Sequence, residues 1–188
     1  MRIEALERGK GFEFVDDVVG GAIPGQFIPA VEKGVRQVLT EGAVAGFPLQ
    51  DIRVTVFDGK YHSVDSKEVA FVSAGRKAFL DAIQKAHPIV LEPVVRMEIT
   101  APATAIGDIT GDLATKRARI NGNDTLPGQR AAVTALVPLA EIVEYQSRLK
   151  SLTGGTGAFT MELSHYDPVP ARKQQELVQA WRPRAEES

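Results

Sequence analysis

The residues of this chain best suited to chemistry are its three histidines, His62, His87 and His165, because imidazole can exchange a proton near neutral pH. None lies in an HExxH segment or one helical turn from another metal-ligating residue type, so their spacing does not indicate a metal site. The sequence has no cysteine and no GxSxG segment, and nothing marks a serine as a nucleophile. We therefore expect neither catalytic residues nor a bound metal.

Paired carboxylates give equally little support for catalysis. Asp16 adjoins Asp17, and Asp108 lies one helical turn from Asp112, which faces solvent on a helical wheel. With 24 acidic residues in the chain, such pairs are unavoidable. We interpret both pairs as solvated surface charges.

Two glycine-rich stretches also have ordinary interpretations. "LTGGTGAF" lacks the lysine of GxxxxGK[ST] and leads from a helix into a strand, the reverse of the order in a phosphate-binding loop. It is typical of a helix C-cap and turn. "ERGKGF" lies between two strand patterns and predicts a hairpin. The chain therefore has no P-loop with which to hydrolyse a nucleotide.

The loop "GGAIPGQFIP", residues 20–29, places two large apolar side chains, Ile23 and Phe27, in a segment expected at the surface. One interpretation is that both fold back onto the core. The other is a tip shaped for recognition, with Gln26 as a polar contact and glycines that permit unusual backbone angles.

The turn "GKYHSVD", residues 59–65, also has two interpretations. His62 alone is most simply a hydrogen-bonded turn residue. Together, however, Lys60, Tyr61 and His62 supply a positive charge, a stacking ring and a group that can both donate and accept hydrogen bonds. Those three types suit irregular or single-stranded RNA. The residues alone leave both interpretations open.

Bulk composition limits what kind of RNA contact is possible. Of 188 residues, 44% are hydrophobic, the net charge is −2, and residues 1–91 and 92–188 each hold 11 basic and 12 acidic side chains. Binding by phosphate neutralisation normally needs a basic surplus, so any RNA contact must be local and shape-dependent. No membrane-spanning run or signal peptide is evident, and we expect a cytoplasmic location.

The elements that must position these residues form an α+β protein of two domains. After a boundary near 91–93, two copies of strand, proline, helix and strand predict a β-α-β-β-α-β, ferredoxin-like sandwich. Before it, strands around 2–6, 11–19 and 51–58 flank a helix that begins near Pro29. A further helix is expected from about Ser66 to Lys85, capped by Asp65 with Glu68 three residues later. We assign domains to 1–91 and 92–175, followed by a tail with a short helix at 176–188.

Linked motifs across most of the chain resemble the last two domains of bacterial elongation factor G. They are "GGAIPGQFIPAVEKG", "GFPLQDIRVTVFDGKYHSVDSKEVAF", "IVLEPVVRMEI", "GDITGDL", "VPLAEIVEY" and "LKSLTGGTGAFTMELSHYDPVP", in this order, from about Arg2 to Val178. The resemblance implies a fourth domain with a left-handed βαβ crossover and a ferredoxin-like fifth domain. It also implies a parent that is a ribosome-dependent GTPase using GTP and Mg, whereas this chain lacks the nucleotide-binding domain and carries no cofactor.

The resemblance further implies partners and contact residues. The expected partner is the ribosome, through 16S and 23S rRNA and the tRNA-mRNA duplex, with the protein a monomer that does not bind membranes. The family's tip loops correspond to residues 20–27 and 58–65, with His62 at the extremity. The implied contacts are Gly20, Gly21, Ile23, Pro24, Gln26, Lys60, Tyr61, His62 and Asp65.

Two departures from the family pattern keep a second hypothesis open. A helix-end motif that is often Arg-Arg-Gly reads Lys116-Arg117-Ala118, and a "GRGSF"-like turn reads Gly155-Thr156-Gly157-Ala158-Phe159. The main hypothesis is a translocase. The alternative is a paralogue that acts in ribosome recycling, or a ribosome-binding module without translocase activity.

Overall fold

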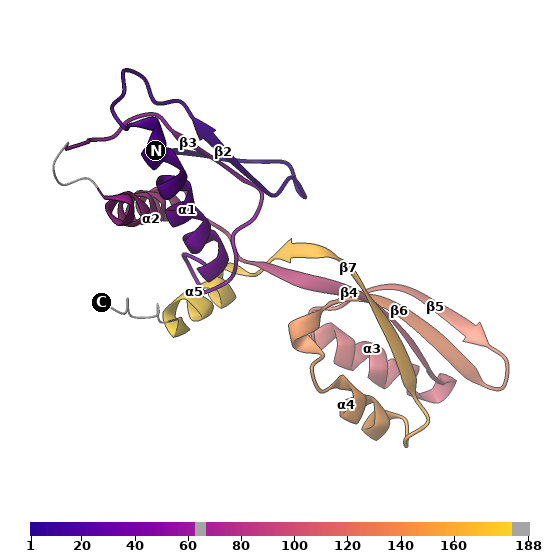
Figure 1. The fold of residues 1–188 in the computed structure, drawn as a ribbon. Helices are drawn as coiled ribbons and strands as arrows, with labels where there is room; N and C mark the ends of the chain where they lie inside the picture. Colours follow the sequence, from indigo (N-terminus) through magenta and orange to yellow (C-terminus); the bar gives the residue numbers. More distant parts are fainter. Residues whose placement is uncertain (63–66, 182–188) are drawn as a thin grey trace. The chain divides into compact units, whose positions relative to one another are not determined.

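The structure is a computed structural model that describes residues 1–62 and 67–181 (Figure 1). The chain divides into two compact units: unit 1 comprises Met1–Val90 with Pro170–Ser188, and unit 2 comprises Leu91–Val169. The two units are α+β in class, as the sequence predicts. The chain thus leaves unit 1 after Val90 and returns to it at Pro170, instead of ending in unit 2.

Unit 1 is built on a three-stranded sheet with the order β1-β3-β2. β1 (Arg2–Ala5) is antiparallel to β3 (Ile52–Val56), and β2 (Phe12–Asp16) is parallel to it. Between β2 and β3 the chain forms a short 3-10 turn, Gly25–Phe27, and α1 (Ile28–Glu41). β2, α1 and β3 therefore make a parallel βαβ unit, because parallel neighbours require a crossover.

The prediction of a hairpin at "ERGKGF" is wrong. β1 and β2 do not pair, because β3 lies between them. The amides of Gly9 and Gly11 instead donate hydrogen bonds to Oδ1 of Asp51, just before β3, at 3.0 and 2.8 Å. These two bonds hold the pKa of Asp51 below its usual range, since they favour the carboxylate. The segment between β1 and β2 thus crosses over the start of β3, where Asp51 holds it.

Two helices pack closely over the same face of this sheet. α2 (Glu68–Lys85) crosses α1 at two glycines, one on each helix, and each glycine lies against the backbone of the other helix. A Cβ on Gly34 would collide with the carbonyl oxygen of Val72, and one on Gly75 would lie 2.5 Å from that of Val31. Glycine is therefore required at this crossing because any side chain would force the helices apart.

Helical spacing predicts that α2 buries a stripe of Val69, Val72, Phe79 and Ile83, and the observed buried face differs from it in part. Phe79 and Ile83 are buried as expected, but Val69 is 70% exposed, and Phe71 takes the buried position at the start of the helix. The helix begins at Glu68 with Lys67 as its N-cap, so residue 69 lies in the first turn, beyond the edge of the core. The predicted capping role of Asp65 falls outside the described residues.

Helix α5 (Ala171–Ala180) returns to unit 1, and contacts of Gln174 and of Trp181, the residue after the helix, attach it there. The Gln174 side chain accepts a hydrogen bond from the Val90 amide at 2.9 Å and donates one to the Pro88 carbonyl at 3.0 Å. Trp181 packs at Gly46, where an added Cβ would lie 2.7 Å from the indole nitrogen. The helix starts at Ala171, earlier than the tail expected at 176–188.

Unit 2 is the ferredoxin-like sandwich that the internal repeat predicts. Its antiparallel sheet has the order β5-β6-β4-β7. The elements are β4 (Leu91–Pro102), α3 (Ile106–Thr115), β5 (Arg119–Leu126), β6 (Arg130–Pro138), α4 (Tyr145–Leu152) and β7 (Ala158–Pro168), with 3-10 turns at Ala103–Ala105 and Leu139–Glu141. Both helices cover one face of the sheet (Figure 1).

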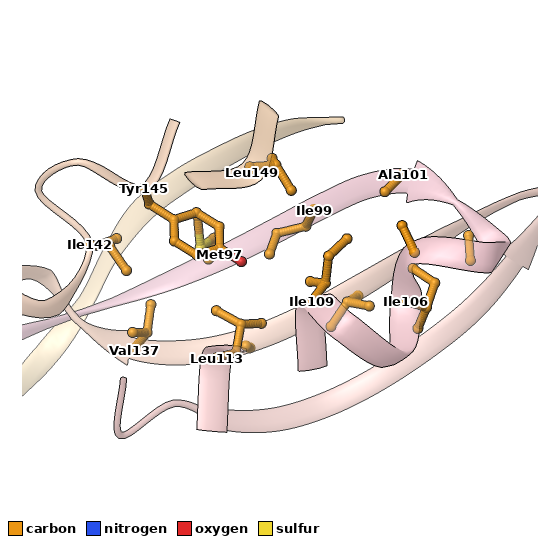
Figure 2. Packing of buried hydrophobic residues seen from close by; sticks show 14 of the residues in the cluster. Met97, Ile99, Ala101, Ile106, Ile109, Leu113, Val137, Ile142, Tyr145 and Leu149 are labelled. Atoms are coloured by element: carbon orange, nitrogen blue, oxygen red, sulfur yellow. The ribbon is translucent and has the colours of Figure 1, made fainter. Parts of the chain in front are cut away.

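A single apolar cluster fills the space between this sheet and its helices. Figure 2 shows Ile109 and Leu113 of α3 beside Met97 and Ile99 of β4, all fully buried. Helical spacing after Pro138 predicts that Val143 also faces this core, but its side chain is 82% exposed. The 3-10 turn at Leu139–Glu141 interrupts the helical period before α4 begins, and so rotates residue 143 outwards.

The end of α4 agrees with the predicted cap. Gly154 and Gly155 have φ of +57° and +86°, and the Gly155 amide donates to the Lys150 carbonyl at 2.8 Å. This bond is the closing hydrogen bond of a Schellman-type C-cap, for which glycine is favoured. "LTGGTGAF" is therefore a helix terminus and turn.

Asp112 does not face solvent as the helical wheel predicts. Its side chain is 9% exposed and pairs with Nε of Arg148 on α4 at 2.7 Å. The hydroxyl of Tyr145 is buried beside it, and neither this hydroxyl nor Asp112 Oδ2 has a hydrogen-bond partner among the described residues. Burial, with the Asp112 charge, raises the pKa of Tyr145 to about 12. The solvent-facing side of α3 is covered here by α4.

Arg117, in the motif that departs from the family pattern, has a structural role. Its backbone is left-handed, with φ of +59°, directly after α3. The guanidinium binds the buried Glu92 carboxylate through two hydrogen bonds of 2.6 and 2.8 Å, and Glu141 at 2.9 Å. Glu92 raises the pKa of Arg117 further above its already high value. Arg117 therefore ties the end of α3 to β4 and to the turn before α4.

Candidate functional site

The two loops that the sequence singles out emerge side by side from unit 1. Their register explains this, because Asp16 at the end of β2 pairs with Val56 at the end of β3, and the strands are parallel. The next amide, of Asp17, still bonds to the Val56 carbonyl at 2.8 Å. We call residues 20–27 the first tip loop and residues 58–62 the second tip loop.

A close apolar contact joins the two tip loops. Ile23 is only 7% exposed, and its side chain lies against Gly59, where an added Cβ would be 2.5 Å from Cδ1 of Ile23. The second tip loop turns at this point, with the Gly59 amide bonded to the Asp58 carboxylate at 2.7 Å. Gly59 is therefore needed for the approach of the loops, not for an unusual φ.

Three aromatic rings continue this connection outwards. Phe27, at the end of the first tip loop, stacks on Phe71 of α2 with centroids 4.4 Å apart and ring planes 12° apart. Phe27 also meets Tyr61 of the second tip loop, with centroids 6.0 Å apart and ring planes tilted by 36°. Phe27 thus bridges a buried ring and an exposed one, and we call Phe71, Phe27 and Tyr61 the aromatic column.

The structure places most of the sequence-predicted contact residues on this surface. Those with exposed positions are Gly20, Gly21, Gln26, Lys60, Tyr61 and His62, and Pro24 is half-buried. The predicted contact at Ile23 needs correction, because its side chain is packed in the core and is only 7% exposed. Asp65 lies outside the described residues. Of the two interpretations of the first loop, folding back holds for Ile23 and Phe27, and exposure holds for the polar residues.

Charge at the tip is acidic rather than basic. Asp16, Asp17 and Asp58 are exposed around the loops, whereas Lys60 is the exposed cation of the second tip loop. Such a surface gains little from phosphate neutralisation. It is better suited to contacts with ring faces, hydroxyls and the edges of bases, which are the recognition modes for irregular RNA.

Metal-ligating side chains do not cluster among the described residues. No group of three or more His, Asp or Glu side chains among them could hold a metal ion. Two shallow hollows, of about 540 Å³ along α1 and about 500 Å³ beside α5, contain none of the tip residues. Within the described ranges, no helix combines the length and apolarity that crossing a membrane requires.

One polar array in unit 2 has no counterpart in the sequence-based predictions. Oγ of Ser164 lies 2.9 Å from Nδ1 of His165, whose Nε2 lies 3.1 Å from Asp167. Asp167 also binds Arg119 at 3.0 Å. A bulge in β7 opposite Val94 and Val95 brings neighbouring side chains together here. The array lies along an open edge strand with its carboxylate already paired, so it has the character of a surface network.

Comparison with known proteins agrees with both halves of this description. Residues 1–87 match the family of elongation factor G domain IV, and residues 89–177 match the family of the elongation factor G C-terminus. An elongation factor G from Aquifex pyrophilus is 48% identical over 178 residues, which cover 95% of this chain and 25% of that protein. A crystal structure from Thermus thermophilus matches with a TM-score of 0.73 and 40% identity, covering 94% of this chain and 26% of that one.

These matches show that the two α+β units are domains of the translation elongation factor class. The chain belongs to the elongation factor G family and corresponds to its domain IV and its C-terminal domain. It spans about a quarter of the length of the curated relative it matches.

Proposed function

We propose that this chain works as the C-terminal part of a ribosome-dependent translational GTPase that moves tRNA and mRNA through the ribosome. The tip loops of unit 1 would enter the decoding region of the small subunit and hold the tRNA-mRNA duplex in register. The observation that carries this proposal is the joint presentation of Gln26, Lys60, Tyr61 and His62 at one end of a domain of the elongation factor G type.

The packing and charge of the tip loops support this proposal in addition to the family matches. The loops are fixed to each other by the Ile23–Gly59 contact and to α2 by the aromatic column, so they form a preorganised surface. Preorganisation reduces the entropy lost on binding. The near-neutral chain, with its acidic tip, has little electrostatic attraction for RNA, so the other domains of the factor must supply the positioning.

The remaining parts of the proposal concern the parent protein. Unit 2 would contact 23S rRNA of the large subunit, and the tip would lie near 16S rRNA. GTP and Mg would bind in a nucleotide-binding domain outside this chain, and the factor would act as a cytoplasmic monomer. None of the chemistry of hydrolysis is assigned to residues 1–188.

The test uses a full-length chimera in which this chain replaces the matching quarter of the Aquifex pyrophilus factor. We expect His62→Ala to slow mRNA movement in a single-turnover translocation assay about tenfold, since losing one contact of about 1.4 kcal/mol has that effect. Ribosome-stimulated GTP hydrolysis should stay near its original rate. An equal loss of both activities, or no loss of either, would contradict the role of the tip.

A matched control and a second assay complete this experiment. His87→Asn alters an exposed histidine of unit 1 outside the tip, and asparagine tolerates its left-handed backbone. It should leave translocation unchanged. Ribosome splitting is measured on the same chimera, because splitting without translocation would instead favour the recycling paralogue.

A further inference from the structure

The aromatic column ends in a ring that is only partly covered. Phe71 is buried, Phe27 is half-buried, and Tyr61 is 40% exposed. Ring contacts thus run from the core to the surface, with Phe27 stacked on Phe71 of α2 and Tyr61 of the second tip loop tilted against Phe27 by 36°. A core-packing role explains the inner two rings, but not why the outermost ring stays accessible.

The neighbours of Tyr61 limit what could cover it. Lys60 and His62 lie on either side in the chain and are exposed, while three exposed carboxylates surround the loops. An anionic phosphate would be repelled by these carboxylates, and a purely apolar peptide would bury Lys60 unpaired. A nucleobase fits better, because its π-face stacks on an aromatic ring and its polar edge can meet neighbouring hydrogen-bonding groups.

We propose that Tyr61 stacks on one unpaired nucleobase of the RNA and that Phe27 is the positioning residue that holds the Tyr61 ring for it. This inference rests on the proposed function, since it names how the tip would recognise RNA. Phe27 does not touch the base. It acts by filling the space behind Tyr61, so that the loop does not have to order its ring when RNA binds.

The experiment compares substitutions at Tyr61 in the same full-length chimera. Tyr61→Phe and Tyr61→Trp keep a stacking face and should translocate within about threefold of the unmodified chimera. Tyr61→Leu keeps an apolar side chain without a π-face and should be about tenfold slower, in line with the loss of one base-aromatic stack. GTP hydrolysis should be unaffected in all three variants.

Phe27 is tested by a double-mutant cycle. Phe27→Leu alone should slow translocation severalfold, but it should add little when Tyr61→Leu is already present, because both changes remove the same interaction. Thermal unfolding of the two single variants is measured in parallel. Additive slowing by the two substitutions would overturn the positioning role of Phe27.

A control and a reference variant make the outcomes distinct. Phe57→Leu changes an exposed aromatic residue at the end of β3 that is outside the column, and it should have no effect. If Tyr61→Leu is as fast as the unmodified chimera while His62→Ala is slow, the stacking inference is overturned and the proposed function stands. If both variants are as fast as the unmodified chimera, the role of the tip itself fails.

Discussion

The two units use similar elements but organise their interiors differently. Unit 2 has one continuous cluster between a four-stranded sheet and two helices. Unit 1 has two smaller clusters, one of which, around Ile23, Val56 and Phe71, lies directly beneath the tip loops. Unit 1 thus uses part of its core to fix loops, whereas unit 2 uses its core to fix the sheet and helices alone.

Polar interactions follow the same division. In unit 2, Arg117 and Arg148 hold the helices to each other and to the sheet through carboxylates that are largely buried. In unit 1, the Ile23–Gly59 contact and the tilted Phe27–Tyr61 ring pair join the loops, and the polar side chains of the tip stay exposed. The polar side chains of the tip in unit 1 therefore remain accessible while the loops that carry them are held in place.

The largest effect is expected from opening the core of unit 2. Leu113→Ala should lower its stability by about 4 kcal/mol, since a fully buried leucine is removed and a cavity remains. The single tryptophan, Trp181, belongs to unit 1. Denaturant unfolding followed by circular dichroism should therefore show an earlier transition that tryptophan fluorescence does not report.

Val143→Ala is the matched control for that experiment. It removes apolar atoms from an exposed residue of the same unit, so the unfolding curve should not change. If Leu113→Ala shifts the tryptophan signal as much as the circular dichroism, the two units do not unfold separately.

A somewhat smaller effect is expected at the helix crossing of unit 1. Gly34→Ala should cost about 3 kcal/mol, because its Cβ would meet the backbone of α2 and force α1 away. Both signals should shift here, since tryptophan fluorescence reports unit 1. Gly111→Ala in α3, which has open space around it, should be neutral or stabilise unit 2 by about 0.5–1 kcal/mol. Equal destabilisation by both would refute a special crossing at Gly34.

The smallest effect at neutral pH is expected at Tyr145. Tyr145→Phe removes a buried hydroxyl without a protein partner among the described residues, so stability near pH 7 should change by no more than about 1 kcal/mol. The folded-state pKa of about 12 lies above the unfolded value of 10.0. The protonated phenol therefore stabilises the fold fully below pH 10, and this contribution is lost as the pH rises towards 12.

The pH profile separates this residue from the other tyrosines. Tyr145→Phe should flatten the fall in stability between pH 10 and 12, as measured by denaturant unfolding at each pH. Tyr166→Phe, at an exposed position of the same unit, should leave the fall unchanged. Identical alkaline profiles for the unmodified protein and Tyr145→Phe would show that this phenol is not buried in solution.

Much of the candidate site could be predicted from local sequence. Glycine and proline mark the first tip loop, and Lys60, Tyr61 and His62 stand out because three recognition chemistries are adjacent in the chain. The burial of Ile23 was one of two open interpretations, since apolar content alone does not say whether a loop folds back. The aromatic column could not be predicted, because it joins rings from three segments that are well separated in the chain.

The sequence by itself determined the elements, the α+β class and the repeat of unit 2, because hydrophobic period, proline and glycine act over a few neighbours. Only the tertiary structure decided the pairing of β1 and β2 with β3, the covering of Asp112 by α4 and the return of α5 to unit 1. Each of these depends on which surfaces meet across long stretches of chain. The same long-range packing unites the two tip loops, and with them the surface proposed to meet RNA.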